Sequence, residues 1–359
     1  MYYEILKNKM SHRYRVLNNI SEIIKITTNE INAYPLTLEI RPANSCNANC
    51  EFCICKLNNK NEMLDSRIFA KLIDEIIESG QIIAIVFSGG GEPSLHPYLT
   101  DAIIRLTEVG VEVGVITNGI YMSEELLKAY MKCSWIRISI NSFNKEDYQK
   151  RTRTTNNTYN TVYQDISGLV SLRKKCNNNL VIGISAVIEE QNWQYRFLSQ
   201  YILLAAELGI DMVTYKRNRT PGLFYRPLDN WIIDALIKLQ EECKIYSNIT
   251  SFIDGEEIKA KREYCNCNLV ENNIISFIDA RGDIYPCLYF AENQRNVLGN
   301  INDSGYRNCI YKSYGERKNI AKYCIHCKMC KNYNMNVLIN KCNNSVINID
   351  NCDPHWKFL

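Results

Sequence analysis

The sequence predicts an α/β protein: a partial (β/α)6 barrel of the TIM type, followed by a cysteine-rich C-terminal domain. From residue 36 to about residue 245, short apolar segments alternate with amphipathic ones, the pattern of parallel strands joined by right-handed helical crossovers. Later in the chain helical periodicity fades, and asparagine, glycine and cysteine become frequent. The expected units are an N-terminal extension (1–35), the barrel (36–245) and the C-terminal domain (246–359).

The barrel elements follow one another in order. The first strand, "LTLEI" (36–40), ends just before a cysteine-rich loop, and "SRIFAKLIDEIIES" (66–79) has the apolar spacing of a helix that Gly80 would cap. The run "IIAIVFS" (82–88) is apolar throughout, as expected of a strand covered on both faces. The later expected helices are 98–108, 123–132, 159–175, 195–208 and 229–245, and the later expected strands are 111–117, 135–140, 180–188 and 211–216.

The C-terminal domain begins with a predicted hairpin. In "IISFIDARGDIYPCLYF" two β-rich runs are joined by a turn at Arg281-Gly282-Asp283. In the barrel, by contrast, ligands are expected at the C-terminal ends of the parallel strands.

Composition excludes several classes of protein. The chain has 359 residues, 46% of them hydrophobic, and a formal net charge of +3, which is too mild to predict a nucleic-acid partner. Its most basic stretch, "KRTRTT" (150–155), is interpreted as a solvated loop. The N-terminus lacks the apolar core of a signal peptide, and no segment approaches the roughly 18 apolar residues of a membrane span, so we expect a cytoplasmic protein with no membrane contact. In that reducing compartment, its 16 cysteines indicate metal or redox chemistry rather than disulfides.

The first cysteine cluster, "CNANCEFCICK", directly follows the first strand. Four cysteines would suit zinc, but zinc sites usually pair two separated CxxC hooks, whereas Cys46, Cys50 and Cys53 have the spacing C-x3-C-x2-C with Phe52 before the third. This resembles the CxxxCxΦC motif of the radical S-adenosylmethionine (radical SAM) superfamily. The resemblance implies that these three thiolates hold a [4Fe–4S] cluster whose fourth iron binds S-adenosylmethionine (SAM). Cys55 is then not a ligand.

Further segments at strand ends resemble the SAM-binding motifs of that superfamily. "FSGGGEPSLHP" resembles the GGE motif, although Gly89 stands where the family more often has Thr or Ser. The resemblance implies that Gly90, Gly91 and Glu92 bind the SAM amino group and that Phe52 lies at the cofactor. It implies that Asn118, Ser139 and Asn141 contact the ribose and carboxylate of SAM. It also implies that Glu190 and Asn192 lie near the adenine.

A second cysteine cluster resembles the SPASM or Twitch extension, in which a β-hairpin and a following helix bind auxiliary [4Fe–4S] clusters. The pattern C-x14-G-x4-C spans Cys267, Gly282 and Cys287, and "CIHCKMC" follows, but the chain then departs from the full SPASM spacing. The resemblance implies at least one auxiliary cluster, and a structural zinc ribbon is the alternative. The expected ligands are Cys267, Cys287, Cys324, Cys327 and Cys330, with Cys265, Cys342 and Cys352 left for a second cluster.

The substrate site is expected between SAM and the C-terminal domain. Tyr215, Lys216 and Arg217 lie at the end of the sixth strand, where a cation could hold a carboxylate or phosphate; a solvated basic turn is the alternative. The expected enzyme abstracts hydrogen from a small polar natural product, sugar-like or aminocyclitol-like, for oxidation, epimerisation or rearrangement. It would receive electrons from a one-electron donor such as flavodoxin or ferredoxin. A maturase or epimerase of ribosomal peptides, and a zinc-structured binding protein without radical chemistry, are the alternatives.

Overall fold

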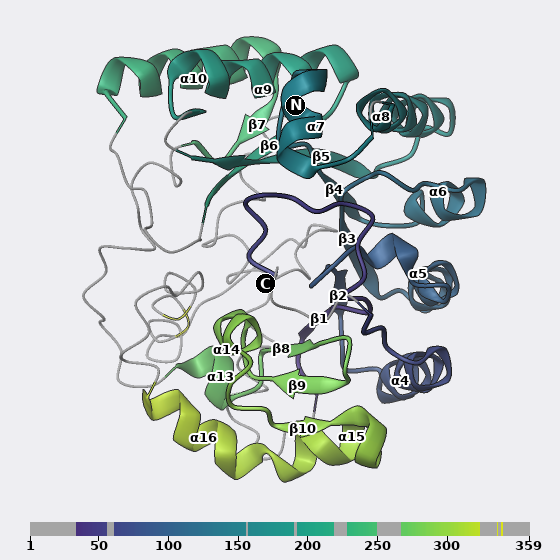
Figure 1. Cartoon of the computed structure of the whole chain (residues 1–359). Helices are drawn as coiled ribbons and strands as arrows, with labels where there is room; N and C mark the ends of the chain where they lie inside the picture. Colours follow the sequence, from purple (N-terminus) through teal and green to yellow (C-terminus); the bar gives the residue numbers. More distant parts are fainter. Residues whose placement is uncertain are drawn as a thin grey trace, which may run out of the picture.

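The computed structural model describes residues 34–55, 61–155, 157–189, 192–218, 228–249 and 267–323, with Asn336 and Ile339. Within these ranges the strands form one ten-stranded sheet in the order β10-β9-β8-β1-β2-β3-β4-β5-β6-β7. From β1 to β6 the strands are parallel. The sheet curves into a partial TIM-like barrel, and helices cover its outer face (Figure 1). The predicted fold class is confirmed.

The observed strands are β1 (Thr37–Ile40), β2 (Ala84–Phe87), β3 (Glu112–Thr117), β4 (Trp135–Ser139), β5 (Val181–Ile188), β6 (Met212–Arg217), β7 (Tyr246–Ser247), β8 (Ile275–Ile278), β9 (Asp283–Tyr285) and β10 (Gly299–Asn300). The barrel helices are α4 (Ser66–Ser79), α5 (Leu99–Glu108), α6 (Glu124–Tyr130), α7 (Lys145–Thr152), α8 (Thr158–Lys175), α9 (Tyr195–Leu208) and α10 (Asn230–Cys243), with a 3-10 turn η1 (Pro93–Leu95). The later helices are α13 (Asn268–Glu271), α14 (Leu288–Asn293), α15 (Ile301–Lys312) and α16 (Tyr314–Tyr323).

Helix α4 shows why the barrel pattern was readable from the sequence. Its apolar residues repeat on one face and are buried, and Asp65 caps its first turn by accepting hydrogen bonds from the backbone N–H groups of Arg67 and Ile68. Gly80 ends it in the left-handed conformation, with φ of 59°. Helix α7, in contrast, was not predicted, because it is short and strongly polar.

The C-terminal hairpin is part of the barrel sheet. Strand β8 pairs in parallel with β1, with Thr37 opposite Ile275, and β9 then returns antiparallel to β8 as predicted. Strand β7 pairs with β6, so the sheet continues through the expected domain boundary at residues 245/246. The C-terminal section therefore extends the sheet from its β1 edge.

Side-chain alternation defines an inner and an outer face of the barrel. On β4, Ile136 and Ile138 are fully buried in the helix-facing core, so Trp135, Arg137 and Ser139 point inward. The Trp135 indole lies against Gly114 of β3, where any Cβ would overlap it. With Met212 packed over Gly183 in the same way, Trp135 forms a floor at the N-terminal end of the barrel interior.

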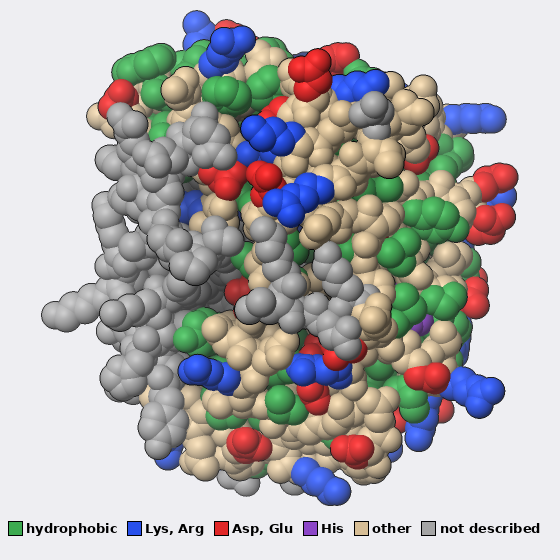
Figure 2. Space-filling view, viewed as in Figure 1, with side chains coloured by type: hydrophobic (Ala, Val, Ile, Leu, Met, Phe, Trp, Pro, Cys, Tyr) green, Lys and Arg blue, Asp and Glu red, His purple; other side chains and the backbone are tan. Residues whose placement is uncertain are grey.

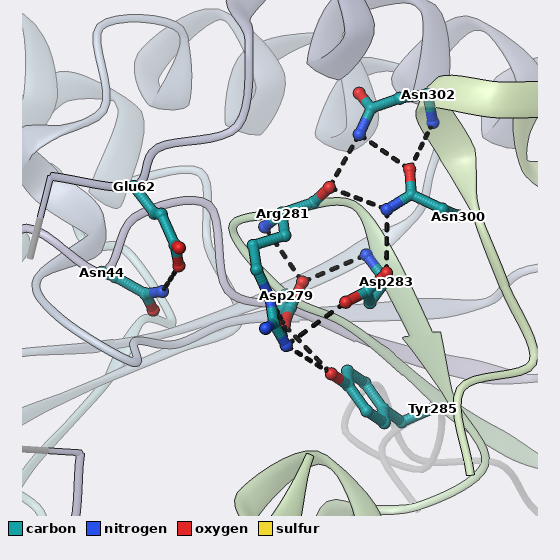
Figure 3. Close-up of polar contacts among 8 residues, drawn as sticks. All are labelled: Asn44, Glu62, Asp279, Arg281, Asp283, Tyr285, Asn300 and Asn302. Atoms are coloured by element: carbon teal, nitrogen blue, oxygen red, sulfur yellow. Dashed lines mark hydrogen bonds and ion pairs between the residues drawn. The ribbon is translucent and has the colours of Figure 1, made fainter. Parts of the chain in front are cut away.

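The β8–β9 turn is held by one carboxylate. Asp279 Oδ1 accepts hydrogen bonds from the backbone N–H groups of Arg281 and Asp283, both at 3.0 Å. Its Oδ2 accepts from the Arg281 guanidinium at 2.8 Å and from the Tyr285 hydroxyl at 3.2 Å (Figure 3). Gly282 completes the turn with φ of 85°, a conformation that favours glycine.

Basic and acidic side chains are intermingled on the face shown in Figure 2. In the described part of the chain, no helix is both long enough and apolar enough to cross a membrane.

The hairpin turn gives a stability prediction. Asp279→Ala removes the acceptor for several donors at once, so we expect the free energy of unfolding to fall by about 2 kcal/mol, measured by urea denaturation. Asp303→Ala, at an exposed position in the first turn of α15, is the control and should change it by less than about 0.5 kcal/mol. Equal effects of the two variants would show that the Asp279 network does not stabilise the hairpin.

Candidate active site

The first cysteine loop leaves β1 and runs across the C-terminal ends of the barrel strands (Figure 1). It is tied to the loop after β2 by two backbone hydrogen bonds: Gly91 N–H donates to Ala43 O at 2.9 Å, and Glu92 N–H donates to Ser45 O at 2.7 Å. A Cβ at Gly91 would overlap the backbone of Asn44 and Ser45. The close approach of the two loops therefore requires glycine at this position.

The glycine run also explains the departure from the family pattern. A Cβ at Gly89 would overlap the carbonyl oxygen of Gly91, so Gly89 is part of the tight turn that brings Gly91 to the cysteine loop. Gly90 is buried between them.

Glu92 is buried beneath this turn, and its side chain bonds to the protein. One carboxylate oxygen accepts from Ser94 N–H at 3.0 Å and from the Thr117 hydroxyl at 2.7 Å, and the other accepts from Asn118 N–H at 2.7 Å. Burial raises the pKa of Glu92, while these donors oppose the rise. The carboxylate thus joins the β2 and β3 loops, a role that the sequence did not predict. Its expected contact with the SAM amino group remains a prediction.

Asn118 connects the β3 end to the cysteines. Its side-chain amide donates to Asn47 Oδ1 at 2.7 Å and lies 3.7 Å from the Cys46 sulfur. The predicted site residues Glu92, Asn118 and Cys46 are therefore brought together.

The thiols of the three predicted cluster ligands lie close enough to one another to interact electrostatically. Burial raises the pKa of the Cys46 thiol, and it raises the pKa of Cys50 to about 12, with the nearby Cys46 and Cys53 thiols adding to the effect. Within the described ranges no three Cys, His, Asp or Glu side chains converge on a single ion. An iron–sulfur cubane needs thiolates on separate irons, so three half-buried neighbouring thiols on one loop fit its donor set. They would lose their protons when metal binds.

Cys55 has different surroundings. A hydrogen bond with Cys53 and burial raise the pKa of its thiol, and its other charged neighbours are Arg41 and Glu292. Arg41 is itself buried and bonds to Glu39 at 3.2 Å. Cys55 thus faces the side of the loop toward β1 and α14.

The other side of the cysteine loop is held by α7. Asn49 N–H and Glu51 N–H each donate at 2.9 Å, to the backbone oxygens of Thr152 and Arg151. The Arg151 guanidinium lies 5.0 Å from the centre of the Phe52 ring and 2.8 Å from Glu189 Oε2. With its side chain 7% exposed, Arg151 is not part of a solvated loop, and that interpretation of "KRTRTT" was wrong. The expected cofactor contact of Phe52 remains a prediction.

Two predicted SAM contacts shape the end of β5. Asn141 Oδ1 accepts from Val187 N–H at 2.9 Å, and Asn192 bonds to the backbone of Glu189 and Val187 at 2.6 and 3.2 Å. Ser139 lies inside the barrel, 3.5 Å from the Ser185 hydroxyl. Glu190 is outside the described residues.

The three substrate candidates separate by strand alternation. Tyr215 is 2% exposed and its hydroxyl donates to Leu198 O in α9, and the Arg217 guanidinium lies over Trp193, which precedes α9. Both side chains face the helix layer, so they do not fit the predicted substrate contact. Lys216 is on the opposite face and points into the barrel. The alternation of side chains along a strand is sufficient to predict that Lys216 faces the opposite side from Tyr215 and Arg217.

The predicted auxiliary ligands are only partly within the described residues. Cys267 is buried at the start of α13; its N–H donates to Ala321 O in α16, and its sulfur accepts from Asn336 Nδ2 at 3.3 Å. Cys287 lies at the start of α14, just after β9. Outside the described residues are Cys265, Cys324, Cys327, Cys330, Cys342 and Cys352.

Comparison with known proteins agrees with this geometry. Residues 40–192 match the model of the Radical SAM superfamily. The chain is 24% identical over 308 residues to the tungsten-containing aldehyde ferredoxin oxidoreductase cofactor-modifying protein of Pyrococcus furiosus, covering 83% of this chain and 84% of that protein. It is 27% identical over 163 residues to an S-adenosylmethionine-dependent nucleotide dehydratase of Selenomonas ruminantium, covering 45% of this chain and 58% of that one.

A solved structure shares the fold. Streptococcus suis SuiB bound to the precursor peptide SuiA has a TM-score of 0.60 at 15% identity, covering 84% of this chain and 71% of that chain. Residues 40–192, which are less than half of the chain, therefore resemble a radical SAM superfamily domain. That superfamily implies a [4Fe–4S] cluster and SAM, and the residues around Cys46 fit both.

Arg151 gives the prediction for this site. Arg151→Met removes the buried cation that pairs with the half-buried Glu189 carboxylate, so we expect a loss of about 3 kcal/mol in unfolding free energy, measured by chemical denaturation. Adding Glu189→Leu should recover a large part of that loss, because the isolated charge is removed. Arg153→Met is the matched control, since Arg153 is 53% exposed and lies 3.6 Å from Glu51. A similar loss in the Arg153 variant would contradict the stabilising role of the Arg151–Glu189 ion pair.

Proposed function

We propose that this chain is a radical SAM enzyme that acts on a small polar molecule. The observation that supports the proposal is the backbone pairing of the cysteine loop with the Gly91–Glu92 turn, because it brings the loop with three thiols to a glycine turn at which a ligand could approach the backbone. When bound, the cluster and SAM supply a 5′-deoxyadenosyl radical by one-electron reduction of the sulfonium.

The chain's own residues would hold and orient these groups. Cys46, Cys50 and Cys53 would ligate three irons, and the absence of a fourth thiolate would leave one iron for the SAM amino and carboxylate groups. The backbone of Gly90 and Gly91 can approach the amino group closely, because no side chain intervenes. Glu92 would act mainly by holding the β2 and β3 loops in register, through the bonds that it makes to Thr117 and Asn118.

At the β5 end, the side chains of Asn141 and Asn192 hydrogen-bond to the backbone, so they would shape a wall against which SAM would lie. Ser139 remains a candidate for direct contact. Cys267 and Cys287, with cysteines from 324–330, are the proposed ligands of an auxiliary cluster. A small one-electron carrier such as flavodoxin or ferredoxin is the proposed reductant.

The substrate class rests on the relatives and on the barrel interior. The two curated relatives described above are named for modifying a cofactor and for dehydrating a nucleotide, which favours a small molecule. We propose hydrogen abstraction from a sugar-like or similarly hydroxylated substrate, leading to oxidation, epimerisation or rearrangement. Modification of a peptide is the second candidate, because SuiB, which shares the fold, was solved with a precursor peptide.

Cys53 and Cys55 separate the radical SAM function from a zinc-structured binding protein. In anaerobically reconstituted protein, Cys53→Ala should lose the SAM-binding cluster and the release of 5′-deoxyadenosine on reduction. Cys55→Ala should keep both, because Cys55 lies outside the ligand set. Iron, sulfide and zinc are counted per chain, and 5′-deoxyadenosine is quantified by chromatography.

The Cys46/Cys50/Cys53→Ala triple variant serves as the reference, and iron that remains in it belongs to the C-terminal cysteines. A wild-type protein that contains zinc and does not cleave SAM would exclude the proposed function. Loss of the cluster in Cys55→Ala but not in Cys53→Ala would reverse the ligand assignment.

A further inference from the structure

The inner wall formed by β4, β5 and β6 carries a row of three hydroxyl side chains. In the strand register Ser139 lies opposite Ser185, and Ser185 lies opposite Thr214. The Ser139 and Ser185 oxygens are 3.5 Å apart. Because neighbours in register share a face, all three hydroxyls point into the barrel at one level.

A cation stands at each end of this row, on a diagonal. Arg137 is two residues before Ser139 on β4, and its guanidinium lies 5.9 Å from the Trp135 ring that forms the barrel floor. Lys216 is two residues after Thr214 on β6, opposite Val187 of β5. Strands are spaced about 4.8 Å apart, so the two cations rise from strands about 10 Å apart.

The inward positions of this wall carry no acidic residue. They are Trp135, Arg137, Ser139, Val181, Gly183, Ser185, Val187, Met212, Thr214 and Lys216.

Three carboxylates near this wall or opposite it bond to other groups. Glu112, at the start of the neighbouring strand β3, accepts from the Ser134 hydroxyl. Glu189 at the rim bonds to Arg151 and, at 2.6 Å, to Asn218. Glu39, across the barrel on β1, bonds to Arg41 and to the Ser88 hydroxyl. The inward positions of the β4–β6 wall thus include two basic residues and three hydroxyls.

We infer that this wall binds a phosphate-bearing group of the substrate, with Lys216 and Arg137 as its charged contacts. A phosphate or diphosphate carries enough negative charge and acceptor oxygens to engage both cations and the hydroxyl row, since charged hydrogen bonds to phosphate are the strong kind. The anionic end would lie between the floor at Trp135 and the SAM site at the strand ends. This inference rests on the proposed function, because it names the substrate class of the same site.

The test uses the reconstituted holoenzyme with inorganic pyrophosphate as the probe and succinate as the carboxylate comparison. Isothermal titration should show pyrophosphate binding that weakens with added salt, and thermal denaturation should show a matching stabilisation. Lys216→Gln and Arg137→Gln should each weaken pyrophosphate binding by at least about tenfold. Two variants are used because Arg137 also packs on the floor.

Arg217→Gln is the matched control. It removes the same charge one residue away, but its side chain faces the helix layer, so pyrophosphate binding should persist. Absence of pyrophosphate binding in the wild type, stronger binding of succinate, or an equal loss in Arg217→Gln would each overturn the inference. Wild-type SAM cleavage is measured in the same preparation: cleavage without anion binding refutes this inference alone, whereas absence of cleavage refutes the proposed function.

Discussion

The candidate site depends on the backbone contact between Ala43–Ser45 and Gly91–Glu92. Two backbone hydrogen bonds join these segments, and both need the close approach that the missing side chain of Gly91 allows. Through this contact the cysteine loop, which follows β1, lies against the C-terminal ends of β2 and β3. A larger residue at Gly91 would push the thiols away from the glycine turn and open the site between them.

Two further anchors hold the same loop from different elements. Glu92 fixes the β3 end through Thr117 and Asn118, and Asn118 in turn reaches Asn47 and the Cys46 sulfur. On the far side, α7 accepts hydrogen bonds from the loop at Asn49 and Glu51, and Arg151 covers the Phe52 ring. A cysteine loop held from three directions would keep its thiols in place when charge develops or moves nearby, which is the form of preorganisation that catalysis requires.

The barrel could be predicted from the sequence because its signals are local. Helix α4 shows its apolar face and its Gly80 cap within one short segment. The partner of β8 could not be predicted, since "ISFI" does not indicate that it will lie beside β1, more than 200 residues earlier. The same limit explains Arg151, whose burial depends on Glu189 and Phe52, both remote in sequence.

For the site residues too, local patterns could be predicted from the sequence, whereas tertiary contacts could not. Motif spacing predicts Cys46 and Glu92 as site residues, but not that the Glu92 carboxylate bonds to Thr117 and Asn118, which is a tertiary contact. Tyr215, Lys216 and Arg217 could not all contact one substrate, although the sequence-based prediction grouped them. Adjacent strand residues face opposite sides, and only Lys216 points inward.

The central claim is that three thiolates leave one iron open beside the Gly91 turn. Electron paramagnetic resonance of the reduced, reconstituted Cys267/Cys287→Ala variant, with and without SAM, tests it directly, because the C-terminal ligand set is disrupted there. The account predicts a reduced [4Fe–4S] signal whose g values change when SAM is added, since SAM would coordinate the open iron. A signal that SAM leaves unchanged would contradict the account, as would protein that binds zinc in place of iron at the first cysteine loop.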